Sequence, residues 1–380
     1  MRIAFVSTYY NPTTGGVEQV IEELATRYAQ QGHHVDVFCS DSDKFNRIKK
    51  KYEQINGVHV YRSRHWFQIG INTNVTPGTI WKLLWNKYDI VHSHVSQHDY
   101  VLFAGLIAFL KGRPHVHTTH CPWTDKFRPV ALQYPLWLSE TFLNYLSFFF
   151  MDKIIAITPW EIPILKRWVS EKKIEVIPNG MDAVLFQTVK KNSYKKKLGI
   201  HTSNKLVLFF GRLHPTKAPH ILAELAKEII RERKNIDFVF VGPDEGEMEK
   251  VKDIVKGEKQ IHVTGPLYGK NNHAEMYQAS DVYVLPSYRE GLPLTIFEAM
   301  ASGLPIVATP CNGIPYEVEE EVNGFLVPFG DKKLLKQRIY EVLDNPKLAK
   351  KIGETNIKKA ENYTWDVIAS KTLDLYYSLV

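Results

Sequence analysis

Short apolar runs typical of buried strands alternate with segments of helical periodicity along the whole chain. The first run covers residues 3–7 and is followed by a polar loop and then by apolar residues at helical spacing. The alternation restarts at residues 206–210, after a polar and lysine-rich stretch. This pattern predicts parallel sheets with helices on both faces, and therefore an α/β protein.

The length of the chain predicts two domains. Its 380 residues exceed what one hydrophobic core usually holds and fit two domains of about 150–200 residues. Turn residues at positions 179–182 precede the lysine-rich stretch, which is the best candidate for a linker. We expect a first domain over residues 1–185 and a second over residues 186–364.

Composition points to a soluble protein of a reducing compartment. Hydrophobic residues make up 44% and charged residues 23% of the chain, and no run approaches the roughly 20 apolar residues of a membrane span. The chain enters its first strand directly, so we expect no signal peptide. The three cysteines are isolated from one another, which favours the cytoplasm and argues against structural zinc.

The net charge of +7 is concentrated in the first half of the chain. Residues 1–180 hold 20 Lys and Arg against 15 Asp and Glu. A basic face can meet phosphate-bearing substrates or an anionic membrane surface, so peripheral electrostatic attachment is one expectation. An ordinary solvated surface is the alternative. No nucleic-acid partner is expected.

The segment 287–298 combines a strand end, a loop and the start of a helix. Pro293 suits a first helical position, which leaves the N–H groups of Leu294 and Thr295 free to hold an anion. A carboxylate at Glu298, about a turn further on, suits a pair of ribose hydroxyls rather than the anion. Glu290, in the loop, can reach a sugar beyond the phosphates. Glu298, the N–H groups at the helix start and Glu290 thus match, in this order, the ribose, the diphosphate and the sugar of a nucleotide diphospho-sugar.

This segment resembles a known family signature. It reads Pro-Ser-x-x-Glu-Gly-x-Pro-x-x-x-x-Glu-Ala-Met-Ala-x-Gly-x-Pro, similar to the donor site of the retaining glycosyltransferases of family 4 (glycosyl transferases group 1). The resemblance implies the GT-B fold, with two Rossmann-like domains facing an interdomain cleft, and a C-terminal helix over residues 365–380 that crosses back to the first domain. It also implies donor contacts from Glu290, Gly291, Leu292, Pro293, Leu294 and Glu298.

A basic loop follows the strand at residues 206–210. Arg212 and Lys217 flank the start of a helix, where a guanidinium can bind two oxygens of a diphosphate and an ammonium can neutralise a third. Such a pair can replace a divalent cation, so we expect no metal and no cofactor. Two solvated cations are the alternative. The resemblance supports the diphosphate role and places Leu267 in the family's base-binding segment.

Two features of the first half extend the expected site. Gly15 and Gly16 immediately precede a helix, which lets the backbone approach a phosphate, although a plain flexible turn is the alternative. His120 lies at the carboxyl end of a strand. The resemblance implies that Gly16 lies against the diphosphate and that His120 faces the donor sugar, with a buried structural histidine as the alternative.

Ten of the fifteen histidines precede residue 121. The spacing of His92 with His94 and of His115 with His117 allows a metal-site hypothesis, because alternate strand residues share a face. No acidic or cysteine partner recurs at ligand spacing, so we do not favour a metal.

An aromatic-rich segment at residues 129–151 contains a single charged residue, Glu140. Proline and scattered polar residues argue against a membrane span. Two interpretations stay open: a helix buried against the sheet, or an apolar surface for an acceptor or a membrane.

Together these features predict a retaining, metal-independent hexosyltransferase that uses a UDP- or GDP-sugar. The acceptor would be a glycan, a lipid-linked sugar or a small polyol, and the enzyme would be cytoplasmic or peripheral on the cytoplasmic membrane face. Catalytic roles fall to His120 and Glu290. The alternatives are a GT-B nucleotide-sugar epimerase and a non-catalytic nucleotide-sugar binding protein. A dinucleotide oxidoreductase is disfavoured, because the chain lacks the G-x-G-x-x-G fingerprint.

Overall fold

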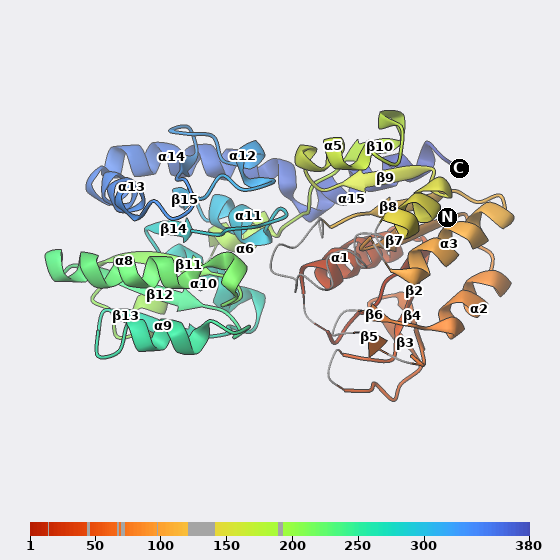
Figure 1. The fold of residues 1–380 in the computed structure, drawn as a ribbon, viewed down its shortest axis with the longest axis horizontal. Helices are drawn as coiled ribbons and strands as arrows, with labels where there is room; N and C mark the ends of the chain where they lie inside the picture. The colour runs from red at the N-terminus through yellow and green to blue at the C-terminus, as the bar shows by residue number, and fades with distance from the viewer. Residues whose placement is uncertain are drawn as a thin grey trace. The chain divides into compact units, whose positions relative to one another are not determined.

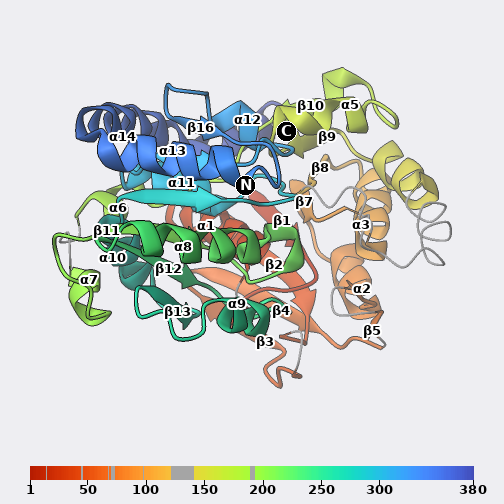
Figure 2. The same ribbon diagram turned by 60° about the vertical axis from the view of Figure 1, so that its left-hand side comes forward.

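The computed structural model describes the chain except residues 14, 44–45, 67, 70–72, 97, 121–140 and 189–192. The described residues form two compact units, Met1–Asn179 with Trp365–Val380, and Gly180–Thr364. Each unit has its own sheet with helices against it (Figure 1). Figure 2 shows the same elements from a second direction.

The first unit contains an eight-stranded sheet in the order β10-β9-β8-β7-β1-β2-β4-β3. All neighbouring strands are parallel except β3, which runs antiparallel to β4. The strands are β1 (Arg2–Val6), β2 (His34–Ser40), β3 (Tyr52–Ile55), β4 (Val58–Ser63), β7 (Ile90–His94), β8 (His115–Thr118), β9 (Lys153–Ala156) and β10 (Ile174–Val176). A separate pair is β5 (Gln68–Ile69) with β6 (Thr73–Asn74).

Helices cover both faces of this sheet. They include α1 (Gly16–Gln30), α2 (Pro77–Trp85), α3 (Asp99–Leu110), a helix at residues 141–149, the short α5 (Ile162–Leu165) and α15 (Trp365–Tyr377). Alternate residues of β1 enter two different cores: Ile3 and Phe5 pack with α1 and α15, while Ala4 and Val6 pack with α2 and α3. A strand buried on both faces reads as a continuous apolar run, which is why β1 was visible in the sequence.

The C-terminal helix α15 is part of the first unit although the second unit precedes it in the chain. Trp365 is 1% exposed within the core that α15 shares with α1. The Tyr28 hydroxyl donates to the Ala369 carbonyl at 3.0 Å, and an ion pair of 2.7 Å joins Arg27 to Asp366. Buried aromatic area and a satisfied hydroxyl therefore hold this helix against α1.

The second unit contains a six-stranded, fully parallel sheet in the order β13-β12-β11-β14-β15-β16. Its strands are β11 (Lys205–Phe210), β12 (Ile236–Val241), β13 (Ile261–Gly265), β14 (Val282–Leu285), β15 (Ile306–Ala308) and β16 (Gly324–Leu326). Its helices are α6 (Ala183–Thr188), α7 (Ser193–Lys197), α8 (Pro219–Glu232), α9 (Met248–Ile254), α10 (Lys270–Ala279), α11 (Leu294–Ala301), α12 (Ile314–Glu317), α13 (Lys332–Asp344) and α14 (Pro346–Ala360).

The expected linker stretch is largely structured. The units divide between Asn179 and Gly180, so residue 185, the expected end of the first domain, falls within α6. Phe186 is buried against Tyr277 at a ring distance of 5.6 Å, and its carbonyl accepts from the Gln278 amide. The helices α6 and α7 thus belong to the second unit.

The order of the strands reverses at one place in each sheet. In the first sheet the chain runs outward from β1 through β2 and then returns to the other side of β1 with β7. In the second sheet the same reversal separates β11 from β14. Loops that leave the carboxyl ends of such strands diverge, and open α/β sheets bind ligands there.

Candidate functional site

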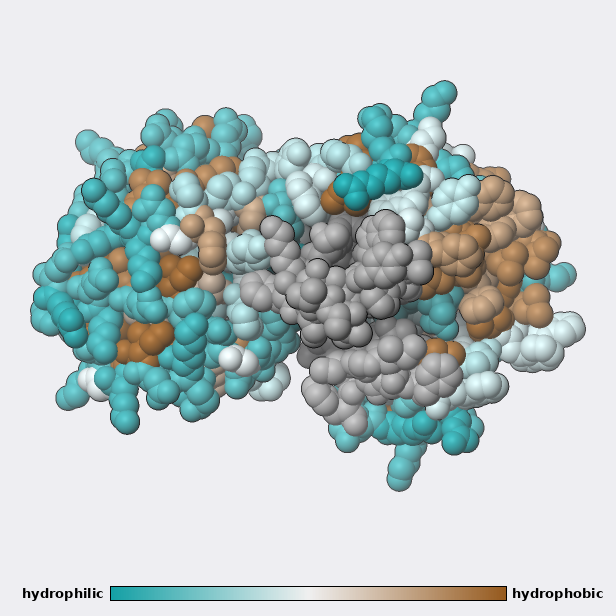
Figure 3. Space-filling view, in the orientation of Figure 1, coloured by the Kyte–Doolittle hydropathy of each residue, from teal (hydrophilic) through white to brown (hydrophobic). Residues whose placement is uncertain are grey.

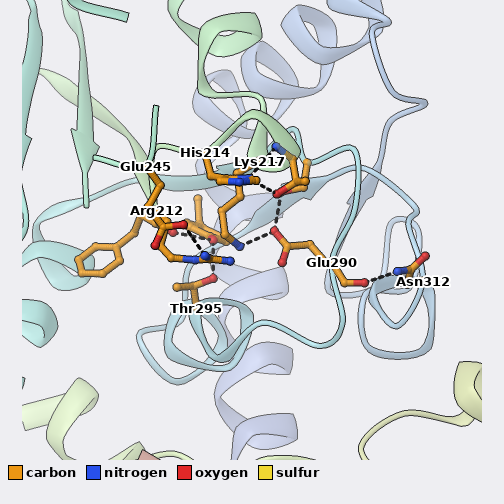
Figure 4. Close-up of polar contacts among 11 residues, drawn as sticks. Arg212, His214, Lys217, Glu245, Glu290, Thr295 and Asn312 are labelled. Atoms are coloured by element: carbon orange, nitrogen blue, oxygen red, sulfur yellow. Dashed lines mark hydrogen bonds and ion pairs between the residues drawn. The ribbon is translucent and has the colours of Figure 1, made fainter. Parts of the chain in front are cut away.

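A buried ion pair lies where the second sheet reverses its strand order. The ammonium of Lys217, from the loop after β11, lies 2.6 Å from a carboxylate oxygen of Glu290, from the loop after β14 (Figure 4). Their side chains are 9% and 7% exposed. The Ser287 hydroxyl donates to the same Glu290 oxygen at 2.6 Å, and the Asn312 amide donates to the Glu290 carbonyl.

Backbone hydrogen bonds join the same two loops. The carbonyl of Thr216 accepts from the N–H groups of Tyr288 at 2.7 Å and Arg289 at 3.2 Å. The His214 ring caps its own turn, because its Nδ1 accepts from the Thr216 N–H at 3.1 Å. Lys217 and Glu290 are therefore held by two loops that are tied together independently of their charges.

Arg212 lies nearby but is much more exposed. Its guanidinium pairs with Glu245, and the side chain is 54% exposed. A surface ion pair of this kind is worth little, so a bound anion can compete for the guanidinium. The backbone before Arg212 is fixed by a close approach: Gly242 has φ +149°, and a Cβ there would lie 1.8 Å from the Gly211 carbonyl oxygen.

The helix α11 begins beside these cations. Pro293 is its N-cap, with φ −72° and ψ 132°, and Leu294 is its first residue. The expectation that Pro293 is the first helical residue is therefore wrong by one position, because its ψ is extended. The Tyr283 hydroxyl lies 2.8 Å from Thr295 Oγ1, in the first turn of α11, and 3.2 Å from the Phe210 carbonyl oxygen at the end of β11, two residues before Arg212. The Ile296 N–H donates to the Pro293 carbonyl at 3.1 Å, whereas the N–H groups of Leu294 and Thr295 precede any intrahelical acceptor and can bind an anion.

The loop before α11 is anchored on the neighbouring segment. The Gly291 carbonyl accepts from the Gly313 N–H at 3.2 Å, and the Leu292 side chain is 4% exposed. Gly291 and Leu292 thus shape the turn that carries Glu290 into α11.

Glu298 lies partly buried on α11. Burial raises the pKa of its carboxyl above the ordinary value, and the nearby His273 acts in the opposite direction. The His273 Nε2 lies 2.9 Å from the Leu267 carbonyl oxygen. This histidine on α10 connects Leu267 with Glu298, and the sequence analysis did not single it out because it lies within a polar helix.

In the first unit, α1 begins at Gly16 and has Gly15 as its N-cap. Both glycines are exposed. A Cβ at Gly15 would meet the carboxylate of Glu18, which folds back toward this end of the helix. Glycine thus leaves the start of α1 uncovered, as close approach by a phosphate requires, while Glu18 adds a negative charge there.

His120 follows β8 in a left-handed backbone conformation, φ 56°. Its Nε2 lies 3.0 Å from the Nδ1 of His94 at the end of β7, and burial lowers the pKa of His120 to about 3. Both rings are therefore neutral at physiological pH. Strained residues of this kind concentrate at functional sites. The buried Glu161 carboxylate accepts from Thr119, the preceding residue, a contact that the sequence did not reveal.

The histidines of β7 and β8 are divided between the two faces of the sheet. His92 bonds Thr118 at 2.8 Å and contacts the Tyr376 hydroxyl on the α15 side, whereas His115 and His117 both bond the Ser93 hydroxyl. The alternation that puts His92 with His94 on one face puts His115 and His117 on the other. Among the described residues, no group of three or more His, Cys, Asp or Glu is arranged to hold a metal ion.

Half of the aromatic segment lies outside the described residues, namely 129–140. Residues 141–149 are helical. Phe148 is buried in the core, while Phe142, Tyr145 and Phe149 are 61–67% exposed. One stripe of this helix therefore packs against the core and another faces outward. The helix is thus buried on one side, and an acceptor or membrane surface on the other side stays a prediction.

Comparison with known proteins identifies the family. The Glycosyl transferases group 1 model matches residues 190–359, and the Glycosyltransferase Family 4 model matches residues 14–184. A curated relative from Escherichia coli, UDP-Gal:alpha-D-GlcNAc-diphosphoundecaprenol alpha-1,3-galactosyltransferase, is 33% identical over 80% of this chain and 79% of its own length. The chain belongs to glycosyltransferase family 4.

More distant relatives place this family 4 glycosyltransferase among enzymes of varied acceptors. A D-inositol 3-phosphate glycosyltransferase of Segniliparus rotundus is 25% identical over 99% of this chain and 88% of its own length. Among solved structures, Anabaena HepE in complex with UDP has a TM-score of 0.80 at 20% identity over both whole chains. Sucrose-phosphate synthase from Thermosynechococcus elongatus has a TM-score of 0.79 at 22% identity, over 100% of this chain and 98% of its own.

These comparisons confirm the family and the fold class predicted from the sequence. The family 4 enzyme has the GT-B fold, with two parallel-sheet α/β domains, and it is a glycosyltransferase that acts on sugar nucleotides. In the described residues no helix is both long and apolar enough to cross a membrane.

The buried histidines make the stability of the first unit depend on pH. Burial lowers the pKa of His115 from 6.5 to about 4. Between these values the unfolded chain binds more protons than the folded chain, so the free energy of unfolding decreases by about 1.4 kcal/mol for each unit by which the pH is lowered, for each such histidine. We expect a steep loss of stability as pH falls from 6.5 towards 4 in denaturant titrations.

A matched pair of variants isolates this effect. His115→Gln should reduce the pH dependence by about one proton, and substitution of the exposed His201 by Gln should leave it unchanged. If the free energy of unfolding depended equally on pH in both variants, buried His115 would not be the source of this dependence.

The Lys217–Glu290 pair should show strong energetic coupling. Lys217→Met or Glu290→Gln leaves one buried charge unpaired, at a cost of about 3–5 kcal/mol, while the double variant should cost less than the sum of the two. Urea unfolding of the four proteins measures the coupling. The same cycle on the exposed pair Arg212 with Glu245 is the control and should give less than about 1 kcal/mol; similar coupling in both cycles would refute the distinction.

Proposed function

We propose that this enzyme transfers a hexosyl unit from a nucleotide diphospho-sugar, with retention of the anomeric configuration and without a metal ion. The observation that carries the proposal is the set of groups around the strand reversal of the second sheet. Lys217 and Glu290 form a buried pair there, Arg212 carries a weakly held guanidinium, and α11 begins beside them. This set offers positive charge for a diphosphate and carboxylates for hydroxyl groups.

The cations would stabilise the charge that develops on the leaving diphosphate. Arg212 can exchange Glu245 for phosphate oxygens at little cost, because its present pair is exposed. Lys217 and the free N–H groups at Leu294 and Thr295 are fixed before the substrate arrives, which is the arrangement that favours a transition state most. A single cation or a helix end alone would hold an anion less specifically than this combination.

The carboxylates would divide the remaining groups of the donor. Glu298 would bind the ribose hydroxyls, with Leu267 and His273 beside it on the base side. Glu290 would contact the hexose. On the first unit, the family resemblance assigns Gly15 and Gly16 to the diphosphate and His120 to the sugar, and the neutral state of His120 suits hydrogen bonding to hydroxyls.

The proposed donor is a UDP-sugar, with a GDP-sugar as the alternative. Solved GT-B neighbours contain UDP, UDP with glucose, and UDP-glucose, and the Escherichia coli relative is named for UDP-galactose. The proposed acceptor is a glycan, a lipid-linked sugar or a small polyol. These classes include the diphospholipid-linked sugar and the inositol phosphate in the names of two relatives. We propose a cytoplasmic enzyme, either free in solution or peripheral on the cytoplasmic membrane face.

The two glutamates should respond differently to substitution. Glu298→Gln should weaken binding of bare UDP about ten- to hundredfold, since a hydrogen bond to a charged group is worth about 1.5–3 kcal/mol. Glu290→Gln should keep the affinity for UDP, because it removes a carboxylate that competes for Lys217, while kcat falls. Calorimetry with UDP and initial rates with the sugar donor measure both effects. Equal loss of UDP affinity in both variants would mean that Glu290 is wrongly assigned to the sugar.

Turnover should not require a divalent cation. Arg212 and Lys217 supply the charge that a metal would otherwise bring to the diphosphate. Rates measured after EDTA treatment should match untreated rates, and Lys217→Met should not be rescued by added magnesium. If EDTA abolished turnover and a divalent cation restored it, metal independence would be refuted.

A further inference from the structure

Large apolar side chains are exposed on three helices of the first unit. On two of these helices they follow one stripe: α2 exposes residues at i, i+3 and i+4, and the helix over 141–149 exposes residues at i, i+3 and i+7. On α3 they are Phe103 and the two residues at its C-terminal end. The opposite stripes of these helices are buried in the core of the unit. We call this set the aromatic patch: Trp81, Leu84, Trp85, Phe103, Phe109, Leu110, Phe142, Tyr145 and Phe149.

The members of the patch lie on neighbouring elements. Trp81 and Trp85 contact each other with ring centroids 5.5 Å apart. The Lys111 ammonium, at the end of α3, donates to the Leu83 carbonyl of α2 at 2.9 Å, which joins the ends of the two helices. Phe150 lies 5.5 Å from Phe109 and 5.2 Å from Phe149, so α3 and the 141–149 helix are also adjacent.

The space-filling view shows a concentration of apolar surface on the first unit. Hydrophobic side chains gather over α2 and α3, on the right-hand side of Figure 3. Trp85 and Leu110 are each 68% exposed. Scattered apolar residues are normal on a soluble protein, but a contiguous patch that includes two exposed tryptophans marks an interaction surface.

Basic residues border the patch. Between residues 77 and 113 the chain has four basic side chains, Lys82, Lys87, Lys111 and Arg113, against two acidic ones, Asp89 and Asp99. Lys87 is exposed just beyond the end of α2. Arg113 lies 3.9 Å from Asp89 in a loose, exposed pair. Lys82 turns away from this border, because its ammonium donates to the Arg62 carbonyl of β4 at 3.4 Å. The remaining three basic residues against Asp89 leave the border with a net positive charge.

Tryptophan and tyrosine next to lysine and arginine match the interface of a lipid bilayer. Aromatic rings there occupy the headgroup region, and basic side chains meet anionic lipids. Since no helix of the described residues could cross the membrane, the contact would be made by helices lying on its surface. We propose that the aromatic patch is a docking surface for an anionic membrane.

This docking mode differs from attachment by charge alone. The positive border draws the unit to the surface, an effect that salt screens, whereas the aromatic rings stabilise the bound state by leaving water. Bound protein should therefore remain partly bound at high salt. The proposal concerns the first unit only and stands whether or not the assignment of the donor site is correct.

Vesicle co-sedimentation tests the proposal. The full chain is mixed with vesicles of equimolar phosphatidylcholine and phosphatidylglycerol, and with vesicles of phosphatidylcholine alone. The unmodified protein should bind the anionic vesicles, with a blue shift of tryptophan fluorescence. W81S/W85S should lower the affinity at least about tenfold, since binding follows the apolar area that is inserted. Lys87→Glu with Arg113→Glu should weaken binding to anionic vesicles and leave binding to neutral vesicles unchanged.

A control variant separates docking from general loss of aromatic surface. Y268S/Y316S removes two rings that are 76% and 51% exposed on the second unit and should bind vesicles normally. Circular dichroism checks that each variant is folded, and UDP calorimetry reports the donor site separately. Unchanged vesicle binding by W81S/W85S would overturn the proposal. So would a concentration-dependent dimer that W81S/W85S abolishes, because the patch would then join two copies of the chain.

Discussion

The ion pair between Lys217 and Glu290 joins the two loops that flank the strand reversal of the second sheet. Burying both charges costs more than their attraction returns unless other groups complete the network. Here the Ser287 hydroxyl donates to the Glu290 carboxylate, the Asn312 amide holds the Glu290 backbone through its carbonyl, and backbone bonds to Thr216 hold the loops together. The cost of desolvation is thus met before any substrate binds, which leaves a preorganised positive group beside α11.

The sequence predicted which residues would form the candidate site but not how they contact one another. Strands such as β1 and β11 are buried on both faces, so they appear as continuous apolar runs and their carboxyl ends can be located. The Lys217–Glu290 contact spans 73 positions in the chain and leaves no local pattern. Pro293 was assigned one position too far into the helix, because proline is compatible with both the N-cap and the first helical turn and only the observed ψ distinguishes them.

The same limit explains the histidines and the aromatic patch. Alternation along β7 correctly placed His92 with His94, yet the offset between β7 and β8 that separates them from His115 and His117 is a property of the sheet. The exposure of Trp81 and Trp85 depends on which elements pack over α2, and the sequence of the helix alone does not determine that packing. Charge and composition therefore predicted a basic first half, whereas the tertiary structure located the exposed rings.

His94 connects the core of the first unit with its candidate catalytic residue. Its ring packs against Phe5 and His92 at centroid distances of 5.7 and 4.2 Å, and its Nδ1 faces the Nε2 of His120. Two neutral imidazoles that share one proton fix each other's orientation, because one must donate and the other accept. The left-handed backbone at His120 is then supported from the sheet. A partly buried, uncharged ring so held can bind sugar hydroxyls and stay neutral, which a fully solvent-exposed histidine at the same strand end would not ensure.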